Sequence, residues 1–201
     1  MGIFNRKSEQ ATEQFDAPTA VVDDISGDYT IDPSHTRIGF SARHAMVTKV
    51  RGQFDEFDAR AEVDGDDLSQ TRIHVAIKTD SINTRNEQRD GHLRSNDFLD
   101  IENNPEITFV STEVTPVDEE TLRVTGDLTI KGTTKPVVID FAYEGAATDP
   151  FGNERVGFSG SVVINRKDWG VNWNAALEAG GVLVSEKVTL EFDISAIRDA
   201  S

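Results

Sequence analysis

Apolar and polar residues alternate along most of the chain after residue 28. The segments RIGFSAR (37–43) and KVTLEFDI (187–194) both place apolar side chains at every second position. Because successive side chains on a strand point to opposite faces, each segment has one apolar face and one polar face. The same period recurs in segments 57–64, 72–78, 107–114, 122–131, 137–143 and 156–164. The pattern therefore predicts about eight long antiparallel strands, each with one face buried.

Turn-forming residues separate most of these segments, at DGD (64–66), DEE (118–120), GT (132–133) and DPFGN (149–153). Eight amphipathic antiparallel strands either close into a barrel, which removes the sheet edges, or stack as two sheets. The interior of an eight-stranded barrel is filled by side chains or holds one small ligand. The period alone leaves a filled barrel, an open barrel and a sandwich as alternatives.

The first 27 residues show no hydrophobic period. They mix Gln, Glu, Thr, Asp and Ala, contain Pro18 and carry more acidic than basic side chains. Segments of this composition bury too little apolar surface to fold by themselves. We therefore predict three parts: a disordered acidic tail over 1–27, one domain over 28–197, and a short C-terminal tail over 198–201.

The alternation breaks a second time between residues 83 and 100, where the chain is mostly polar. The apolar residues of this segment are Leu93, Phe98 and Leu99. Asn83 is a candidate N-cap, because its side chain can accept a hydrogen bond from the first turn of a helix. We predict a short helix and a loop that cover one end of the barrel, with a kink or a stop at Gly91.

Composition and charge narrow the functional classes. The 201-residue chain has a formal charge of −16, which repels phosphate backbones and anionic lipid surfaces, so we expect no nucleic-acid partner. The absence of cysteine excludes disulfides and thiolate chemistry. The first residues lack the apolar region of a secretory signal, and Arg6 breaks the myristoylation pattern. No apolar run approaches the roughly 18 residues of a transmembrane helix, and we predict a cytoplasmic protein.

The histidines are His35, His44, His74 and His92, and none belongs to a compact metal-binding pattern, so no metal site is expected. His74 alternates with apolar neighbours and is predicted to face solvent. His44 shares its parity with Phe40, which predicts that it turns inward at the end of a strand. An inward imidazole needs a hydrogen-bond partner, either on a neighbouring strand or at the polar end of a ligand.

The other two histidines have polar surroundings. His35 ends the turn DPSH (32–35), whose short polar side chains bond the local backbone, and we interpret it as part of a structural corner. His92 lies in RDGHLRS (89–95), beside Arg89. That cluster either caps a helix and pins it to the barrel, or contacts the head group of a ligand.

Six blocks of this chain, in this order, resemble the YceI-like family. The blocks are YTIDPSHTRIGFSARH (29–44), VRGQFDEF (50–57), SINTRNEQRDGHLRSNDFLD (81–100), NPEITFVST (104–112), GDLTIKGTTKPV (126–137) and NRKDWG (165–170). The resemblance covers about residues 28–197. It implies an all-β, lipocalin-like barrel that binds a polyisoprenoid lipid, and thus favours the open barrel among the alternatives.

The resemblance and the strand pattern together suggest a ligand-binding set. Its members are Phe40, His44, Phe54, Ile77, Arg89, His92, Phe98, Phe109, Leu128, Phe141, Phe158 and Trp169. The apolar members would bury an isoprenoid tail, and the polar members, His44 and the Arg89–His92 cluster, would contact its head group. No cofactor is expected other than a bound isoprenoid lipid or quinone.

Three functions follow from this reading. The first is a non-enzymatic binding or carrier protein for an isoprenoid-type lipid: a polyprenol, a polyprenyl phosphate or an isoprenoid quinone. The second is an enzyme that acts on a bound lipid or quinone, in which His44 with Asp90 or Asp97 would exchange protons. The third is a packed barrel that acts, as a stress-related or interaction protein, through its surface and acidic tail. The oligomeric state is open, with a homodimer suggested by the general frequency of two-fold symmetry.

Overall fold

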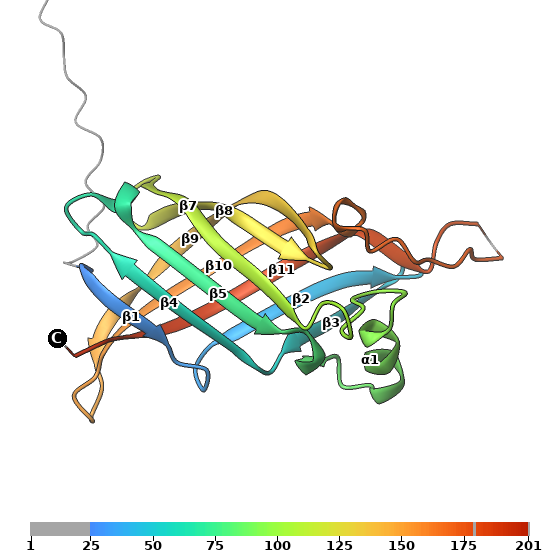
Figure 1. Cartoon of the computed structure of the whole chain (residues 1–201), viewed down its shortest axis with the longest axis horizontal. Helices are drawn as coiled ribbons and strands as arrows, with labels where there is room; N and C mark the ends of the chain where they lie inside the picture. The colour runs from blue at the N-terminus through green and yellow to red at the C-terminus, as the bar shows by residue number, and fades with distance from the viewer. Residues whose placement is uncertain (1–24, 179, 201) are drawn as a thin grey trace, which may run out of the picture.

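Eight antiparallel strands form a closed ring in the computed structural model, which describes residues 25–178 and 180–200 (Figure 1). In ring order, the strands are β1 (Gly27–Ile31), β4 (Phe57–Val63), β5 (Arg72–Lys78), β7 (Glu106–Pro116), β8 (Thr121–Ile130), β9 (Thr133–Thr148), β10 (Glu154–Asn165) and β11 (Val184–Arg198). The ring closes where β1 pairs with β11, with Tyr29 opposite Arg198. The prediction of an eight-stranded antiparallel barrel is confirmed.

Three further strands extend the wall beside β11. They are β2 (Arg37–His44), β3 (Thr48–Phe54) and β6 (Ile82–Asn83). The last residues of β11 pair with β1, whereas its middle residues pair with β2, where Leu190 lies opposite Phe40. β1 and β2 therefore occupy successive stretches of one edge of β11. This arrangement makes the β2–β3 hairpin a projection at one end of the barrel (Figure 1).

The inward side chains form two apolar clusters. The larger consists of Ile38, Ile77, Ile107, Leu128, Val137, Ile139, Ile164 and Trp169. The smaller consists of Ile25, Tyr29, Leu122 and Val156, with Leu68 from the 3₁₀ turn η1 (Leu68–Gln70) packed against it. This second cluster fills the end of the barrel at which β4 and β5 are joined; we call it the closed end.

The domain boundaries differ slightly from those predicted. Ile25 is 6% exposed within the smaller cluster, so the folded part begins a few residues before 28. At the other terminus, β11 continues to Arg198, and the Asp199 amide donates to the Asp28 carbonyl. The predicted tail, apart from its last three residues, lies outside the described residues.

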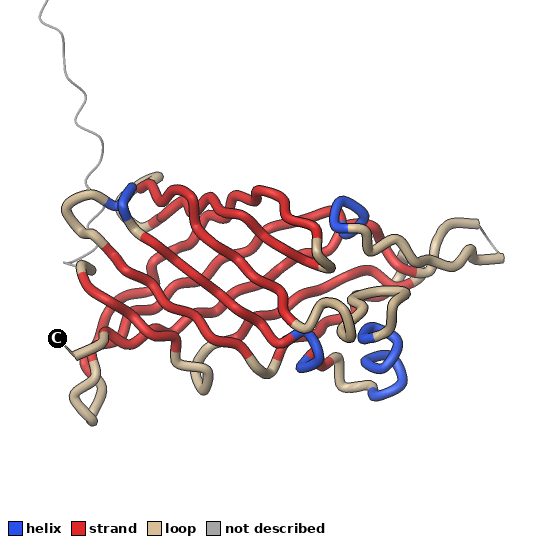
Figure 2. The backbone as a smooth tube through the Cα atoms, in the orientation of Figure 1, coloured by secondary structure: helices blue, strands red, loops and turns tan. Residues whose placement is uncertain are grey.

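A short helix and the loop after it cover the other end of the barrel (Figure 2). The 3₁₀ turn η2 (Thr79–Ser81) and β6 lead into this helix, α1 (Glu87–Arg94). Its N-cap is Asn86, whose side chain accepts a hydrogen bond from the Arg89 amide at 2.9 Å. The predicted cap at Asn83 is wrong, because Asn83 belongs to β6. Gly91 also neither kinks nor stops the helix, which continues for three more residues.

The helices of the described chain are all short. None of them is both long enough and apolar enough to cross a membrane.

Candidate ligand-binding site

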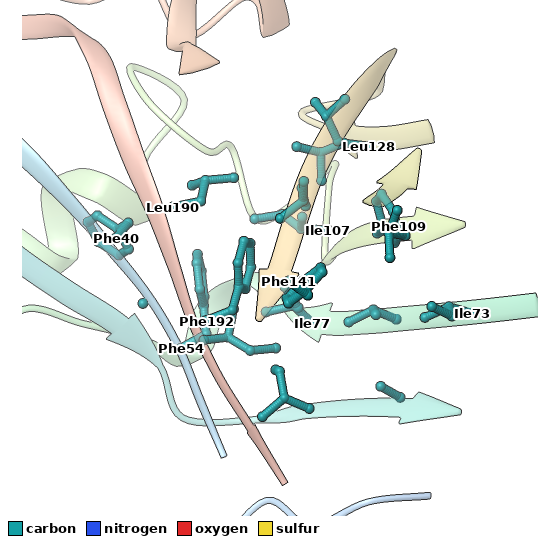
Figure 3. Close-up of a pocket in the computed structure, with 18 of the residues that line it drawn as sticks. Phe40, Phe54, Ile73, Ile77, Ile107, Phe109, Leu128, Phe141, Leu190 and Phe192 are labelled. Atoms are coloured by element: carbon teal, nitrogen blue, oxygen red, sulfur yellow. The ribbon is translucent and has the colours of Figure 1, made fainter. Parts of the chain in front are cut away.

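The barrel interior holds a cavity of about 350 Å³ whose wall is apolar (Figure 3). Every strand of the ring contributes inward side chains to it, and Leu93, Phe98 and Leu99 of the α1 segment line it from the covered end. Its size lies at the lower end of the range of small-molecule sites, roughly 300–1,000 Å³. The described part of the chain therefore forms an open barrel and not a filled one.

Glycines opposite phenylalanines help to keep this space open. Phe40 on β2 lies against Gly52 on β3, and Phe141 on β9 lies against Gly160 on β10. A methyl group at Gly52 would approach the Phe40 Cε1 to 2.8 Å, well inside ordinary van der Waals contact. The missing side chain thus lets each ring pack directly against the backbone of the neighbouring strand.

All nine apolar residues of the predicted set line the cavity. These residues are Phe40, Phe54, Ile77, Phe98, Phe109, Leu128, Phe141, Phe158 and Trp169. They come from β2, β3, β5, β7, β8, β9 and β10, from the loop after α1, and from the 3₁₀ turn η3 (Arg166–Trp169). The alternation rule and the resemblance together therefore identified inward positions on separate strands that the fold brings to one space.

His44 does not face the cavity, and the prediction that it turns inward is wrong. Its side chain is exposed, although Phe40 and Ala42, which share its parity, line the cavity. His44 is the last residue of β2 and lies opposite Thr48 and Val184. Val184 still lines the cavity, whereas the His44 side chain is exposed where β2 ends and the turn to β3 begins.

Arg89 and His92 also lie outside the cavity lining, where they hold the α1 segment in place. Arg89 donates to the Thr84 hydroxyl at 2.7 Å and to the Thr84 carbonyl at 2.9 Å. The His92 ring makes edge contacts with Phe98 and Trp173, with centroid distances of 5.0 and 4.6 Å. Of the two alternatives for this cluster, the structure supports the one in which it pins the helix to the barrel.

Arg166 is the buried cation that the sequence analysis did not select. It is 6% exposed, lines the cavity, and its guanidinium lies 5.9 Å from the centre of the Phe98 ring. It donates to three backbone carbonyls, those of Ser185 at 3.0 Å, Val171 at 2.6 Å and Val184 at 3.4 Å. Burial lowers its pKa from the usual arginine value. Within the described residues no carboxylate lies at ion-pair distance from it.

Its neighbour Trp169 is fixed by a hydrogen bond from the indole Nε1 to the Leu128 carbonyl at 2.9 Å. Both residues belong to the block NRKDWG, which was the available signal for Arg166. This block resembles the family, but the resemblance did not indicate a ligand-binding role for Arg166. No local pattern indicated that the arginine would be buried, because its carbonyl partners lie up to 19 residues away in sequence.

The polar cluster in the turn DPSH is separate from the cavity. Asp32 is 8% exposed and accepts hydrogen bonds from the Ser34 hydroxyl at 2.6 Å and from Arg155, and these bonds lower its pKa well below the usual range. His35 Nδ1 lies 2.7 Å from Asp32 and 3.1 Å from the Ser34 hydroxyl. A catalytic triad needs serine and aspartate at opposite ring nitrogens, so this cluster is the predicted structural corner.

The two aspartates considered as proton-exchange partners of His44 bond to other residues. Asp90 accepts from the Thr84 hydroxyl at 2.5 Å, and Asp97 lies 2.9 Å from His92 Nε2, so neither contacts His44. Across the described ranges, no group of three or more potential ligand side chains is placed to hold a metal ion.

The fold and the cavity define the class first: a lipocalin-like β-barrel with an apolar internal cavity. The model of the YceI-like domain matches residues 29–196, and the chain belongs to this family. Among curated relatives, the UPF0312 protein SERP2314 of Staphylococcus epidermidis is 41% identical over 164 residues, which cover 81% of this chain and 93% of the relative. The UPF0312 protein SAS2572 of Staphylococcus aureus is 40% identical with the same coverage.

Solved structures agree in fold. The Campylobacter jejuni YCEI protein superimposes with a TM-score of 0.68 and 29% identity, covering 79% of this chain and 90% of that chain. Burkholderia cenocepacia BcnA gives a TM-score of 0.72 at 21% identity, with coverage of 82% and 98%. A polyisoprenoid binding domain from Saccharophagus degradans gives 0.65 at 13% identity, with coverage of 85% and 98%. At these identities the last two indicate a shared fold alone.

Proposed function

We propose that this protein is a non-enzymatic carrier that holds an isoprenoid-type lipid in the barrel cavity. The observation that carries the proposal is the apolar cavity of about 350 Å³, whose wall offers an isoprenoid tail aromatic and aliphatic contacts on all sides. Burial of each methylene group contributes about 0.8 kcal/mol, so about ten carbons supply roughly 8 kcal/mol before ordering costs are subtracted. The Saccharophagus degradans structure, which shares this fold, is a polyisoprenoid binding domain. This analogy between folds supports an isoprenoid as the class of ligand.

The polar head group is assigned to the neighbourhood of Arg166. A guanidinium is a strong donor to phosphate and carbonyl oxygens, and Arg166 holds its charge at the cavity wall with carbonyl partners. The nearest acidic influence on it, Glu186, forms its ion pair with Lys167 at 2.6 Å and makes no direct ion pair with Arg166. A polyprenyl phosphate would supply a directly bonded counter-ion, and a quinone carbonyl would accept a hydrogen bond. The residues expected for this task from the sequence, His44, Arg89 and His92, lie outside the cavity lining.

The fluorescence of a tryptophan in the cavity wall can be used to measure ligand binding. Trp169 is one of two tryptophans, lies in the cavity wall and is 4% exposed. Titration with an isoprenoid quinone should therefore quench tryptophan fluorescence saturably at one quinone per barrel, and Trp169→Phe should remove most of the signal. The matched control is the same quinone ring without its isoprenoid tail. Equal, non-saturating quenching by both compounds would contradict the carrier proposal.

A further inference from the structure

The tip of the β2–β3 hairpin exposes apolar side chains. Met46 is 55% exposed and Val47 is 78% exposed, in the turn between the end of β2 and the start of β3. Ala45 and Met46 both have positive φ angles, 49° and 60°, a conformation that favours glycine and asparagine. Folding alone would favour glycine or asparagine over methionine at position 46. Stability of the hairpin therefore does not account for the exposed Met46 side chain.

The outward face behind the tip is basic. Arg43 lies opposite Lys49, and Arg51 lies two residue pairs further along the hairpin, on the same face; all three are exposed. Between residues 33 and 54 the chain has four basic residues and no acidic one, although its overall charge is −16. Like charges directly opposite on paired strands are destabilising.

Few carboxylates neutralise this face. Lys49 Nζ lies 3.7 Å from Glu191, whereas no ion pair joins Arg43 or Arg51 to a carboxylate in the part of the chain that the structure describes. The stability of the folded hairpin therefore does not explain why these basic residues lie together on its outward face.

The acidic residues without basic neighbours in sequence gather at the closed end, whereas the five carboxylates of segment 83–103 at the covered end are interspersed with Arg85, Arg89 and Arg94. The turns at the closed end carry Asp64, Asp66, Asp67, Asp118, Glu119, Glu120 and Asp149 and no lysine or arginine. β11 spans 15 residues between the two ends, or roughly 50 Å at about 3.3 Å per residue. The screening length at physiological salt is about 8 Å. The charges at one end therefore have little effect on the electrostatic potential at the other end. A negatively charged surface attracts the basic hairpin and repels the acidic closed end.

The tip also adjoins the covered end of the cavity. The Ala45 amide donates to the Leu183 carbonyl at 2.7 Å, and the next residue, Val184, lines the cavity. Arg166 donates to the carbonyls of Val184 and Ser185 on the same strand. The hairpin, the start of β11 and the polar part of the cavity therefore lie side by side.

We propose that the β2–β3 hairpin docks the barrel on an anionic phospholipid surface. Met46 and Val47 enter the acyl region, while Arg43, Lys49 and Arg51 contact lipid phosphates, as exposed apolar patches rimmed by basic residues do at membranes. In this orientation the covered end of the cavity faces the bilayer. The interaction goes beyond the carrier proposal and does not depend on it, because it uses residues outside the cavity.

Flotation of the full chain with vesicles tests the apolar part. Vesicles of phosphatidylcholine and phosphatidylglycerol in a 7:3 ratio contain no isoprenoid lipid, so failure of this proposal is distinct from failure of the carrier proposal. The double change Met46→Ser/Val47→Ser should weaken partitioning at least tenfold. Phe151 is the matched control, since it is 90% exposed at the tip of the β9–β10 turn of the closed end. Phe151→Ser should leave partitioning unchanged.

The basic part is tested on the same vesicles. Arg51→Gln should weaken partitioning about fivefold, corresponding to about 1 kcal/mol for one cation near an anionic membrane, and should reduce the salt dependence. Arg72→Gln, which removes an exposed arginine near the closed end, should have no such effect. Thermal melts verify that the variants fold. A wild-type chain that stays unbound, or hairpin variants that float like wild type, would overturn the proposal. Self-association that Met46→Ser abolishes, without vesicle binding, would overturn it in favour of a protein partner.

Discussion

Gly52→Ala tests whether cross-strand glycines keep the cavity open. The added methyl group would overlap the end of the Phe40 ring and approach the Thr84 Cγ2 to 2.8 Å. Ordinary contact requires about 3.4–4 Å, so the ring has to leave its place on the wall. Gly52 and the adjacent strand lie behind the ring, and the cavity lies in front of it. The displaced ring therefore moves into the space assigned to the lipid.

The expected stability change is small because the ring has free space to enter. Crowding a core costs about 1–3 kcal/mol, and an empty cavity favours the lower value. Replacing glycine also lowers the conformational entropy of the unfolded chain, which stabilises the folded protein by about 0.4–1 kcal/mol. The net loss of about 0–0.6 kcal/mol corresponds to a Tm lowered by at most about 2 °C for a domain of this size. If the ring excludes two methylene groups of the ligand, the loss of about 1.6 kcal/mol weakens lipid binding about fifteenfold.

Two variants control this experiment. Phe40→Leu removes the ring atoms that overlap the new methyl group, so the double variant Gly52→Ala/Phe40→Leu should recover binding relative to Gly52→Ala alone. Gly91→Ala places a methyl group on α1 with no atom within 4 Å, and it should stabilise the protein by about 0.5–1 kcal/mol without changing binding. Urea unfolding and quinone titration measure both quantities. Strict additivity of the two changes, with wild-type binding by Gly52→Ala, would refute the reasoning.

Further predictions concern polar residues. Asp32→Asn should lower the free energy of unfolding by about 2–3 kcal/mol at pH 7, because it leaves Arg155 with a weakened partner. The pKa of Asp32 is lowered in the folded state, so its contribution is present above about pH 4 and is lost as pH falls further. The difference between wild type and variant in urea unfolding should shrink below pH 4, and a constant difference would contradict this assignment. Arg166→Met should weaken binding of a polyprenyl phosphate at least tenfold while leaving binding of the matching polyprenol nearly unchanged; equal losses for both lipids would exclude a head-group role. His44→Ala should change stability by less than about 0.5 kcal/mol and leave quinone binding intact, as its exposed position requires.

The strands were predictable because their cause is local. In a barrel wall, one face of every strand is buried, so the alternation of apolar residues can be read without knowledge of the neighbouring strand. Phe109 and Phe141 were placed correctly for this reason, although they come from different strands. The glycines opposite the rings were not recognised as a set, because the register that pairs Phe40 with Gly52 is a property of the folded sheet.

The polar part of the site was not predictable by the same rule. His44 has the parity of Phe40 and Ala42, but it is the last residue of β2, and the point at which a strand leaves the cavity wall is a property of the folded sheet. Arg166 donates to the backbone carbonyls of Val171, Val184 and Ser185. Every residue type has a backbone carbonyl, so the amino-acid sequence does not indicate which residues will accept these hydrogen bonds. The sequence identified the apolar wall of the cavity, whereas the cation on that wall required the fold.

The central claim is that the barrel carries an isoprenoid-type lipid, and native mass spectrometry of the purified protein tests it most directly. The account predicts a stoichiometric adduct on the folded protein that organic extraction identifies as a polyprenol, a polyprenyl phosphate or an isoprenoid quinone. Gly52→Ala should carry less of it than wild type. A mass equal to that of the bare chain, unchanged after incubation with each of these lipids, would contradict the claim.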